Sequence, residues 1–168
     1  MFEKLSTPEE IFSFKLGAAL SMENTVLDSI GDLEAASQRP EIKELFKGHA
    51  AETRQQIQNT ESAFRLLGED VDDSPCPAMK AITKEGSATI KKTDDSVVDA
   101  AVLAGAAEVE HHEIAVYETL VTNAIARGAT EVADLLQQNL DQELHALAEI
   151  QRIGKQISLA GIAVPVPA

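Results

Sequence analysis

The clearest evidence for the fold lies in residues 97–126, which read VVDAAVLAGAAEVEHHEIAVYETLVTNAIA. Small and apolar side chains recur there every three or four positions, at Val98, Leu103, Ala106, Ala107, Tyr117, Leu120 and Ala124. This spacing predicts an amphipathic α-helix, because residues three and four apart share one face. Glu110 and Glu113 interrupt that apolar face. The segment therefore predicts a long helix with carboxylates on its buried side.

Four further segments repeat the helical period: Pro8 to Ala36, Glu41 to Leu67, a shorter one from Ala78 to Lys92, and Glu131 to Ile157. In the first segment, the predicted apolar face contains Phe12, Leu16, Ala19, Leu20, Leu27 and Ile30. In the second it contains Ile42, Leu45, Ala63, Phe64 and Leu67, and in the last it contains Leu136, Leu147, Ile150 and Ile153. Thr7-Pro8-Glu9-Glu10 predicts a capped helix start, and Thr93-Asp94-Asp95-Ser96 offers another cap. Gly68 suits a helix C-terminus.

The lengths of the connections between these segments predict the topology. Residues 37–40 and 127–130 form short turns, whereas residues 69–96 form a long crossover with a short helix inside it. We therefore expect an all-α, antiparallel four-helix bundle made of two helical hairpins, with a three-helix or open array as the alternative. The bundle is expected to occupy residues 1–159 as one domain, and residues 160–168 to be an irregular tail, since two prolines lie there.

Composition narrows the partners and the compartment. The formal net charge of −14 disfavours binding to nucleic acid and to anionic membranes. No stretch approaches the roughly 18 apolar residues that a membrane span requires. Cys76 is the one cysteine, so no disulfide forms within the chain, and the first residues do not resemble a secretory leader. A cytoplasmic protein is the resulting expectation.

Each long predicted helix carries polar residues on its apolar face. They are Glu23 in the first helix, His49 and Glu52 in the second, Glu110 and Glu113 in the next long helix, and Glu143 in the last. Glu23 and Glu52 are equidistant from one turn, and Glu113 and Glu143 are equidistant from the other. Both pairs lie about 15 residues from their turns, roughly 22 Å along the helix. If the hairpins pack side by side, these four carboxylates meet at the middle of the bundle.

Buried unpaired carboxylates are costly, so a chain that buries several of them needs cations to balance them. Oxygen donors with one imidazole favour iron or manganese over a structural zinc site. Any single glutamate here is more often a solvated helix residue than a ligand. Only the full set, with its matching levels, predicts a centre for two metal ions.

Other polar residues are weaker candidates. His111 is turned away from the face of Glu110 and Glu113, and could serve a helix contact or an outer role at the site. His145 is expected to face solvent or a partner. Tyr117 could donate a hydrogen bond to a ligand carboxylate, but packing is the simpler reading. Cys76 lies between two prolines without a visible base, so a structural role is expected.

The order of these motifs resembles the YciE/YciF-like family of bacterial ferritin-like proteins. The similar residues are Glu23, His49-Ala-Ala-Glu52-Thr53 with Gln56 following, Cys76-Pro-Ala-Met, Glu110-His-His-Glu-Ile-Ala-Val-Tyr117 and Glu143. The resemblance implies a ferritin-like bundle, a homodimer, stress-linked expression and a rubrerythrin-like dimetal centre. It implies Glu23, His49, Glu52, Glu110, Glu113 and Glu143 as ligands. The usual signature is Glu-x-x-His in two helices. Here His49 precedes Glu52, and Ala146 stands where a second histidine is expected.

Three functions follow from this sequence. The first is a di-iron oxidoreductase, with manganese or zinc as other metals, that acts on oxygen or peroxide. It would require an external electron donor, because the chain has no Cys-x-x-Cys. The second is a non-catalytic stress protein whose metal stabilises the bundle and whose outer faces bind a partner. The third is a bundle without metal, in which a polar channel solvates the glutamates.

Overall fold

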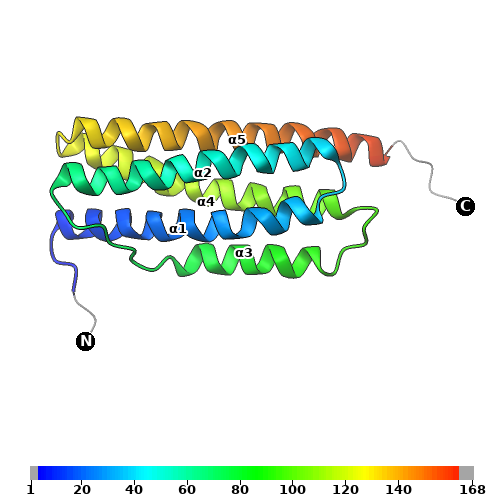
Figure 1. Ribbon diagram of the computed structural model, residues 1–168, viewed down its shortest axis with the longest axis horizontal. Coiled ribbons are helices and arrows are strands. Elements are labelled where there is room, and N and C mark those ends of the chain that lie inside the picture. Colours follow the sequence, from blue (N-terminus) through cyan, green and yellow to red (C-terminus); the bar gives the residue numbers. More distant parts are fainter. Residues whose placement is uncertain (1–3, 163–168) are drawn as a thin grey trace, which may run out of the picture.

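A computed structural model describes residues 4–162 of the protein, which form α-helices and no strand (Figure 1). The helices are α1 (Pro8–Ala36), α2 (Pro40–Leu67), α3 (Pro77–Ile90), α4 (Val98–Ala126) and α5 (Thr130–Ile162). The predicted all-α fold is confirmed, including the short helix in the crossover. Because α5 continues to Ile162, residues 160–162 are helical rather than irregular. The rest of the expected tail, residues 163–168, lies outside the described part.

Four of the helices form an antiparallel bundle (Figure 1). Packing contacts join α1 to α2, α2 to α5, α5 to α4 and α4 to α1, so the four helices enclose one core. The crossover brings the chain from the end of α2 back to the opposite end of the bundle, where α4 begins (Figure 1). Within this crossover, α3 lies outside the four-helix core and packs against α1 and α4.

Two of the helix ends predicted from the sequence are confirmed, and a third is wrong. The capping box of Thr7 and Glu10 starts α1, and Gly68 ends α2 with a φ of 73°. The expectation that residues 93–96 cap α4 is wrong, because the N-cap of α4 is Val97 and has no side-chain hydrogen bond. Asp94 Oδ1 instead accepts hydrogen bonds from the N–H of Ser96 at 2.9 Å and from its hydroxyl at 2.6 Å. This local turn uses the carboxylate that the sequence offers as a cap.

Asp99 of α4 caps a different helix. The N-cap of α2, Arg39, makes no side-chain capping bond. Instead, Asp99 accepts hydrogen bonds from the backbone N–H of Gln38 at 2.7 Å and of Arg39 at 3.2 Å. Charged acceptors satisfy the free N–H groups at a helix start strongly. Asp99 therefore joins the start of α2 to the start of α4, and so joins the two hairpins.

The first part of the crossover lies closely against α1. A side chain at Gly17 would place its Cβ 3.0 Å from the backbone of Asp72 and of Ser74, so only glycine leaves room for the loop. One turn further, the Ser21 hydroxyl donates a hydrogen bond to the backbone oxygen of Asp73 at 3.0 Å. These contacts hold the segment that places Cys76 at the start of α3.

The predicted buried face of α2 is correct at Ile42, Ala63 and Phe64 and differs at Leu45. Leu45 is only partly buried, whereas Phe46 is 1% exposed. In α1, similarly, Leu27 is partly buried and Val26 is buried. The remaining predicted core residues of α4 and α5 are buried, apart from the half-buried Ala107.

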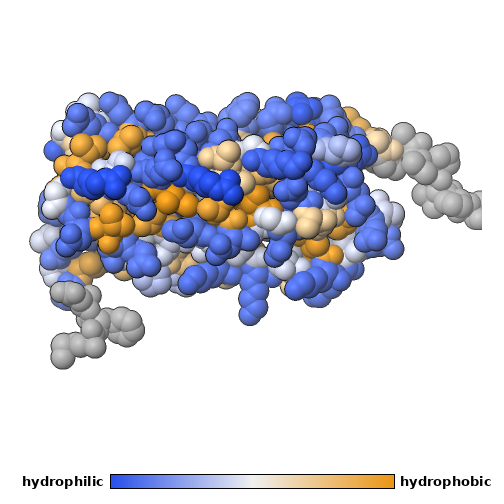
Figure 2. Space-filling model, viewed as in Figure 1, coloured by the Kyte–Doolittle hydropathy of each residue, from blue (hydrophilic) through white to orange (hydrophobic). Residues whose placement is uncertain are grey.

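The surface seen in Figure 2 is mostly hydrophilic, with a band of hydrophobic residues running lengthwise through its middle. None of the helices in residues 4–162 combines the length and the apolar character that crossing a membrane requires.

Candidate metal centre

The six predicted ligands come from the four bundle helices and lie near the middle of each. Five of them are buried, with exposed fractions of 0% for Glu23, Glu113 and Glu143, 1% for Glu110 and 5% for His49. A carboxylate is rarely buried unless it is paired. Four such carboxylates in one core therefore indicate a common function.

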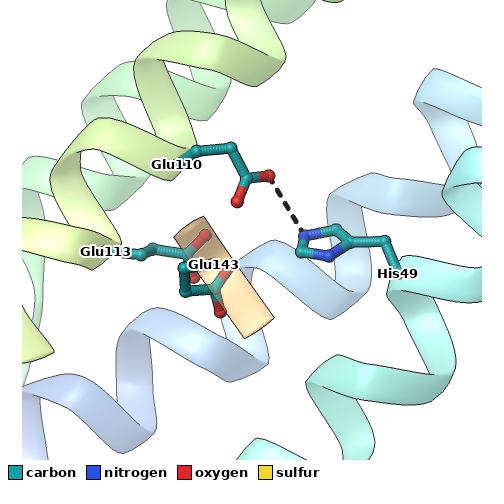
Figure 3. Close-up of side chains that lie close together, drawn as sticks. All are labelled: His49, Glu110, Glu113 and Glu143. Atoms are coloured by element: carbon teal, nitrogen blue, oxygen red, sulfur yellow. Dashed lines mark ion pairs between the residues drawn. The ribbon is translucent and has the colours of Figure 1, made fainter. Parts of the chain in front are cut away.

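Four of these residues form one tight cluster. Each of His49, Glu110, Glu113 and Glu143 offers an atom suited to binding a metal, and these atoms all lie within 4.8 Å of one another. Figure 3 shows the carboxylates of Glu113 and Glu143 close together, and Glu110 directed at the imidazole of His49. Nε2 of His49 lies 3.2 Å from Oε1 of Glu110. The set therefore joins α2, α4 and α5 at one point of the core.

Glu23 approaches this cluster from α1. Its charge interacts with Glu113 and with Glu143, and its Oε1 accepts a hydrogen bond from the Tyr117 hydroxyl at 2.5 Å. The reading of Tyr117 as packing alone is therefore wrong. Tyr117 is fully buried, and a buried hydroxyl requires a partner. The sequence placed Tyr117 one turn beyond Glu113 but could not reveal its contact with another helix.

Glu52 lies at the edge of the site. Its side chain is 38% exposed, and its Oε2 is 3.9 Å from Nδ1 of His49. The buried face of α2 passes instead through His49, Thr53 and Gln56, which alternate by four and three residues. Glu52 is one position off this face, so it reaches His49 from the solvent side. Its role as a ligand remains a prediction.

The buried carboxylates lack hydrogen-bond partners. Within the described residues, no partner is found for Oε2 of Glu23, Oε2 of Glu110, and both oxygens of Glu113 and of Glu143. Neither ring nitrogen of His49 has a hydrogen bond of acceptable geometry. A buried unsatisfied polar atom costs about 1–3 kcal/mol, and more when charged. The free atoms are carboxylate oxygens and an imidazole nitrogen, which are the donor types that iron and manganese accept. The residues therefore fit a metal centre.

Burial and mutual repulsion keep protons on these carboxyls in the absence of a cation. Burial raises the pKa of Glu113 well above its usual range, and the charge of Glu143 raises it further. The pKa of Glu143 rises for the same first reason, with Glu110 as the second cause. Burial also raises the pKa of Glu110 from 4.5 to about 7. Without a cation, the site therefore holds protons that a metal ion would displace.

His49 and Glu52 respond to each other. Burial lowers the pKa of His49, but the surrounding carboxylates, beginning with Glu52, outweigh burial and raise it. The contact with His49 lowers the pKa of Glu52. The carboxylate of Glu52 therefore favours a charged or metal-bound imidazole at the edge of the cluster.

Sequence analysis missed Gln56 as part of the site. Gln56 is fully buried, and neither its amide nitrogen nor its amide oxygen has a hydrogen-bond partner among the described residues. Its spacing of seven residues from His49 could have identified it, because seven residues are two helical turns. A glutamine among buried carboxylates offers a donor to one of them.

The expectation that Cys76 has no neighbouring base is wrong. Sγ of Cys76 is 3.9 Å from Nε2 of His112, and the thiol is buried. Burial lowers the pKa of this histidine, and Lys15 lowers it further. His111 and His145 are exposed, in contrast to the buried His49.

Comparison with known proteins gives consistent results over nearly the whole chain. Residues 7–163 match the family described as "Domain of unknown function (DUF892)". Protein YciF of Escherichia coli strain K12 is 30% identical over 141 residues, which are 83% of this chain and 85% of that protein. The crystal structure of the E. coli stress protein YciF matches with a TM-score of 0.85 and 28% identity, over 89% of this chain and 96% of that one.

Two other solved structures share the fold. YcfI from Rhodopseudomonas palustris matches with a TM-score of 0.87 and 27% identity, over 90% of this chain and 97% of that one. A protein from Xanthomonas campestris matches with a TM-score of 0.73 and 22% identity, over 93% of this chain and 96% of that one. The bundle with its crossover helix is thus a recurring arrangement in bacteria.

Proposed function

This chain belongs to the DUF892 family, and its 30% identity to YciF agrees with the resemblance of its motifs to the YciE/YciF-like family. On that premise, we propose that its core holds two divalent metal ions, iron foremost. The observation that carries the proposal is the set of four buried carboxylates around His49 with six oxygens that lack a partner. Four carboxylates carry four negative charges when ionised, and two divalent cations neutralise them. Manganese or zinc could occupy the same donors.

Each ligand has a distinct part in this proposal. Glu110, Glu113, Glu143 and His49 would hold the pair, since their donor atoms lie within 4.8 Å of one another. Glu23 would contribute Oε2, because its Oε1 is engaged by Tyr117. Glu52 would serve from the edge, where it is already paired with His49.

The proposed activity is the reduction of oxygen or peroxide. A bound iron pair would supply the electrons for this chemistry, and an external donor would restore them. The protein's own residues exclude bulk water from the centre, because all of the clustered donors are buried. They also release protons when cations bind, because burial raises the pKa values of Glu113 and Glu143. Since YciF is named a stress protein, we extend a role in stress response to this chain. We likewise infer a homodimer, which sedimentation would test.

Metal binding and reaction with an oxidant test the proposal separately. Protein from iron-supplemented cells should contain about two metal ions per chain, as in other two-metal sites. Glu113→Gln should lose most of this metal, whereas Glu118→Gln, an exposed position on the same helix, should retain it. Iron(II) added without air and then mixed with peroxide should be oxidised faster than iron in buffer. Full metal content without faster oxidation would favour the non-catalytic stress protein. Metal content well below one ion per chain would refute the proposal.

A further inference from the structure

Tyr117 stands at the inner end of a chain of hydrogen bonds that begins at the surface of α2. The exposed Gln55 donates from Nε2 to Oδ1 of Asn59 at 3.0 Å, and Asn59 donates from Nδ2 to Oδ1 of Asn139 at 2.8 Å. Asn139 then donates from Nδ2 to the Tyr117 hydroxyl at 3.0 Å. The Tyr117 hydroxyl donates to Oε1 of Glu23. Every donor in the chain points toward the metal centre.

A backbone carbonyl fixes this direction. Nδ2 of Asn139 also donates to the backbone oxygen of Gln56 at 3.2 Å. A carbonyl oxygen only accepts hydrogen bonds, so the amino group of Asn139 must face it. That same amino group faces the Tyr117 hydroxyl, whose single proton must therefore go to another acceptor. Oε1 of Glu23 accepts it.

The bundle does not need these polar groups for packing. Asn139, Tyr117 and Glu23 are fully buried, and Asn59 is 5% exposed. Replacing both partners of a buried hydrogen bond by apolar groups of similar shape is nearly neutral for stability. An apolar core of leucine and phenylalanine would therefore serve the fold as well. The polar chain instead acts on the one residue at its end, Glu23.

We propose that Tyr117 is a positioning residue that Asn139 and Asn59 orient, and that it makes Glu23 a one-oxygen ligand. The hydroxyl engages Oε1 of Glu23, and Oε2 remains without a partner and available to a cation. The inference rests on the proposed metal binding, but its hydrogen-bond geometry exists before any cation is bound.

Tyr117 can be observed directly by absorption spectroscopy. Tyr117 is the single tyrosine, and the protein has no tryptophan, so the absorption band near 280 nm belongs to Tyr117. The wavelength of tyrosine absorption depends on the group that accepts the hydrogen bond from its hydroxyl. In cation-free protein, Glu23→Gln replaces this acceptor and should therefore shift the band. Asn139→Asp should shift it too, because a carboxylate at position 139 competes with Glu23 for the proton. Asn123→Asp adds the same charge at a half-buried position of α4 that lies outside the hydrogen-bond chain, and it should leave the band unchanged.

Cation affinity supplies the second readout, with manganese(II) as the probe. Residues that support a ligand typically change metal affinity by about 10- to 100-fold when they are lost. Tyr117→Phe should weaken manganese binding within this range, and Asn139→Asp should weaken it as well. In the Tyr117→Phe background, Asn139→Asp should have little further effect, because Asn139 acts through the hydroxyl. If Tyr117 and Asn139 only stabilised the fold, the substitutions would change stability. The effect of Asn139→Asp on manganese affinity would then be the same with and without the Tyr117 hydroxyl.

The outcomes separate the two proposals. If the band of cation-free protein does not move in Glu23→Gln and Asn139→Asp, the positioning inference is overturned, whatever the metal results. If the two substitutions weaken binding additively, or Tyr117→Phe binds manganese like the wild type, it is overturned as well. If the wild type binds no cation while the band shifts as expected, the proposed function fails. The hydrogen-bond chain would then stand, without its role toward a cation.

Discussion

Removal of the cation should make the protein lose stability as the pH rises. The experiment removes all bound cation with a chelator. It then measures unfolding by urea at about pH 5 and at about pH 7.5, at constant ionic strength. Glu110 has a pKa of about 7 in the folded protein against an ordinary 4.5. The folded state therefore binds protons more tightly than the unfolded state does. Its stability is full below about pH 4.5 and declines as the pH rises toward 7.

The magnitude follows from the same residue. Each pKa unit corresponds to about 1.4 kcal/mol, so Glu110 alone should lower the free energy of unfolding by about 3 kcal/mol across this interval. Glu23, Glu113 and Glu143 act in the same direction, because burial raises the pKa of each. His49 adds to the loss at higher pH, since its raised pKa means that its proton also favours the folded state.

Circular dichroism at 222 nm would follow the unfolding. Glu110→Gln should remove its share of the pH dependence, and it should make the cation-free protein more stable at about pH 7.5. Glu108→Gln, an exposed position on the same helix, should leave the pH dependence unchanged. Saturating manganese(II) should abolish the loss, because the cation displaces the protons. A cation-free protein equally stable at both pH values would refute the reasoning on the buried carboxyls.

Three further outcomes follow from particular contacts. Gly17→Ala should lower the free energy of unfolding by about 1–3 kcal/mol in chemical denaturation, because its Cβ would lie 3.0 Å from the crossover backbone. Gly48→Ala has open space and should instead be neutral or stabilising by up to about 1 kcal/mol. Asp99→Ala should cost about 1–2 kcal/mol in the same assay, because it removes the cap of α2. In calorimetric titration, Glu143→Gln should weaken manganese binding at least about ten-fold more than Glu52→Gln, and equal losses would contradict the edge position of Glu52.

The fold could be predicted from the sequence because its signals are local. The helical period of residues 97–126, the capping box at Thr7 and the glycine at position 68 each act within one or two turns of helix. The short turns and the long crossover then leave few arrangements of the hairpins. Local signals do not identify a cap that comes from another helix. The capping of α2 by Asp99, which is 60 residues from Arg39 in the sequence, was therefore not predicted.

The sequence could predict that most of the candidate ligands are buried, but it could not predict their geometry. Interrupted apolar faces identified Glu23, Glu110, Glu113 and Glu143, all of which are buried. Within α2, Glu52 was placed on the buried face although its side chain is 38% exposed, because His49 and Glu52 share a side of a helix almost as well as His49 and Thr53 do. An error of 100° in helical phase separates a buried position from a half-exposed one.

Contacts between helices were beyond the sequence pattern. The hydrogen bond from Tyr117 to Glu23 spans 94 residues, and the approach of Cys76 to His112 spans 36. Such pairs depend on how helices pack and on how closely the crossover lies against Gly17. Periodicity within one helix contains no information on these distances.

Anomalous diffraction from crystals of the protein as purified, recorded on both sides of the iron absorption edge, tests the central claim most directly. The account predicts two peaks about 3.5–4 Å apart, which is the usual separation in two-metal sites. They should lie among His49, Glu110, Glu113 and Glu143, with Oε2 of Glu23 directed at one of them. Peaks at the same positions at the manganese edge would identify the metal as manganese instead of iron and would still support the proposed site. Crystals that show no anomalous peak among these side chains, after growth with both metals supplied, would contradict the account.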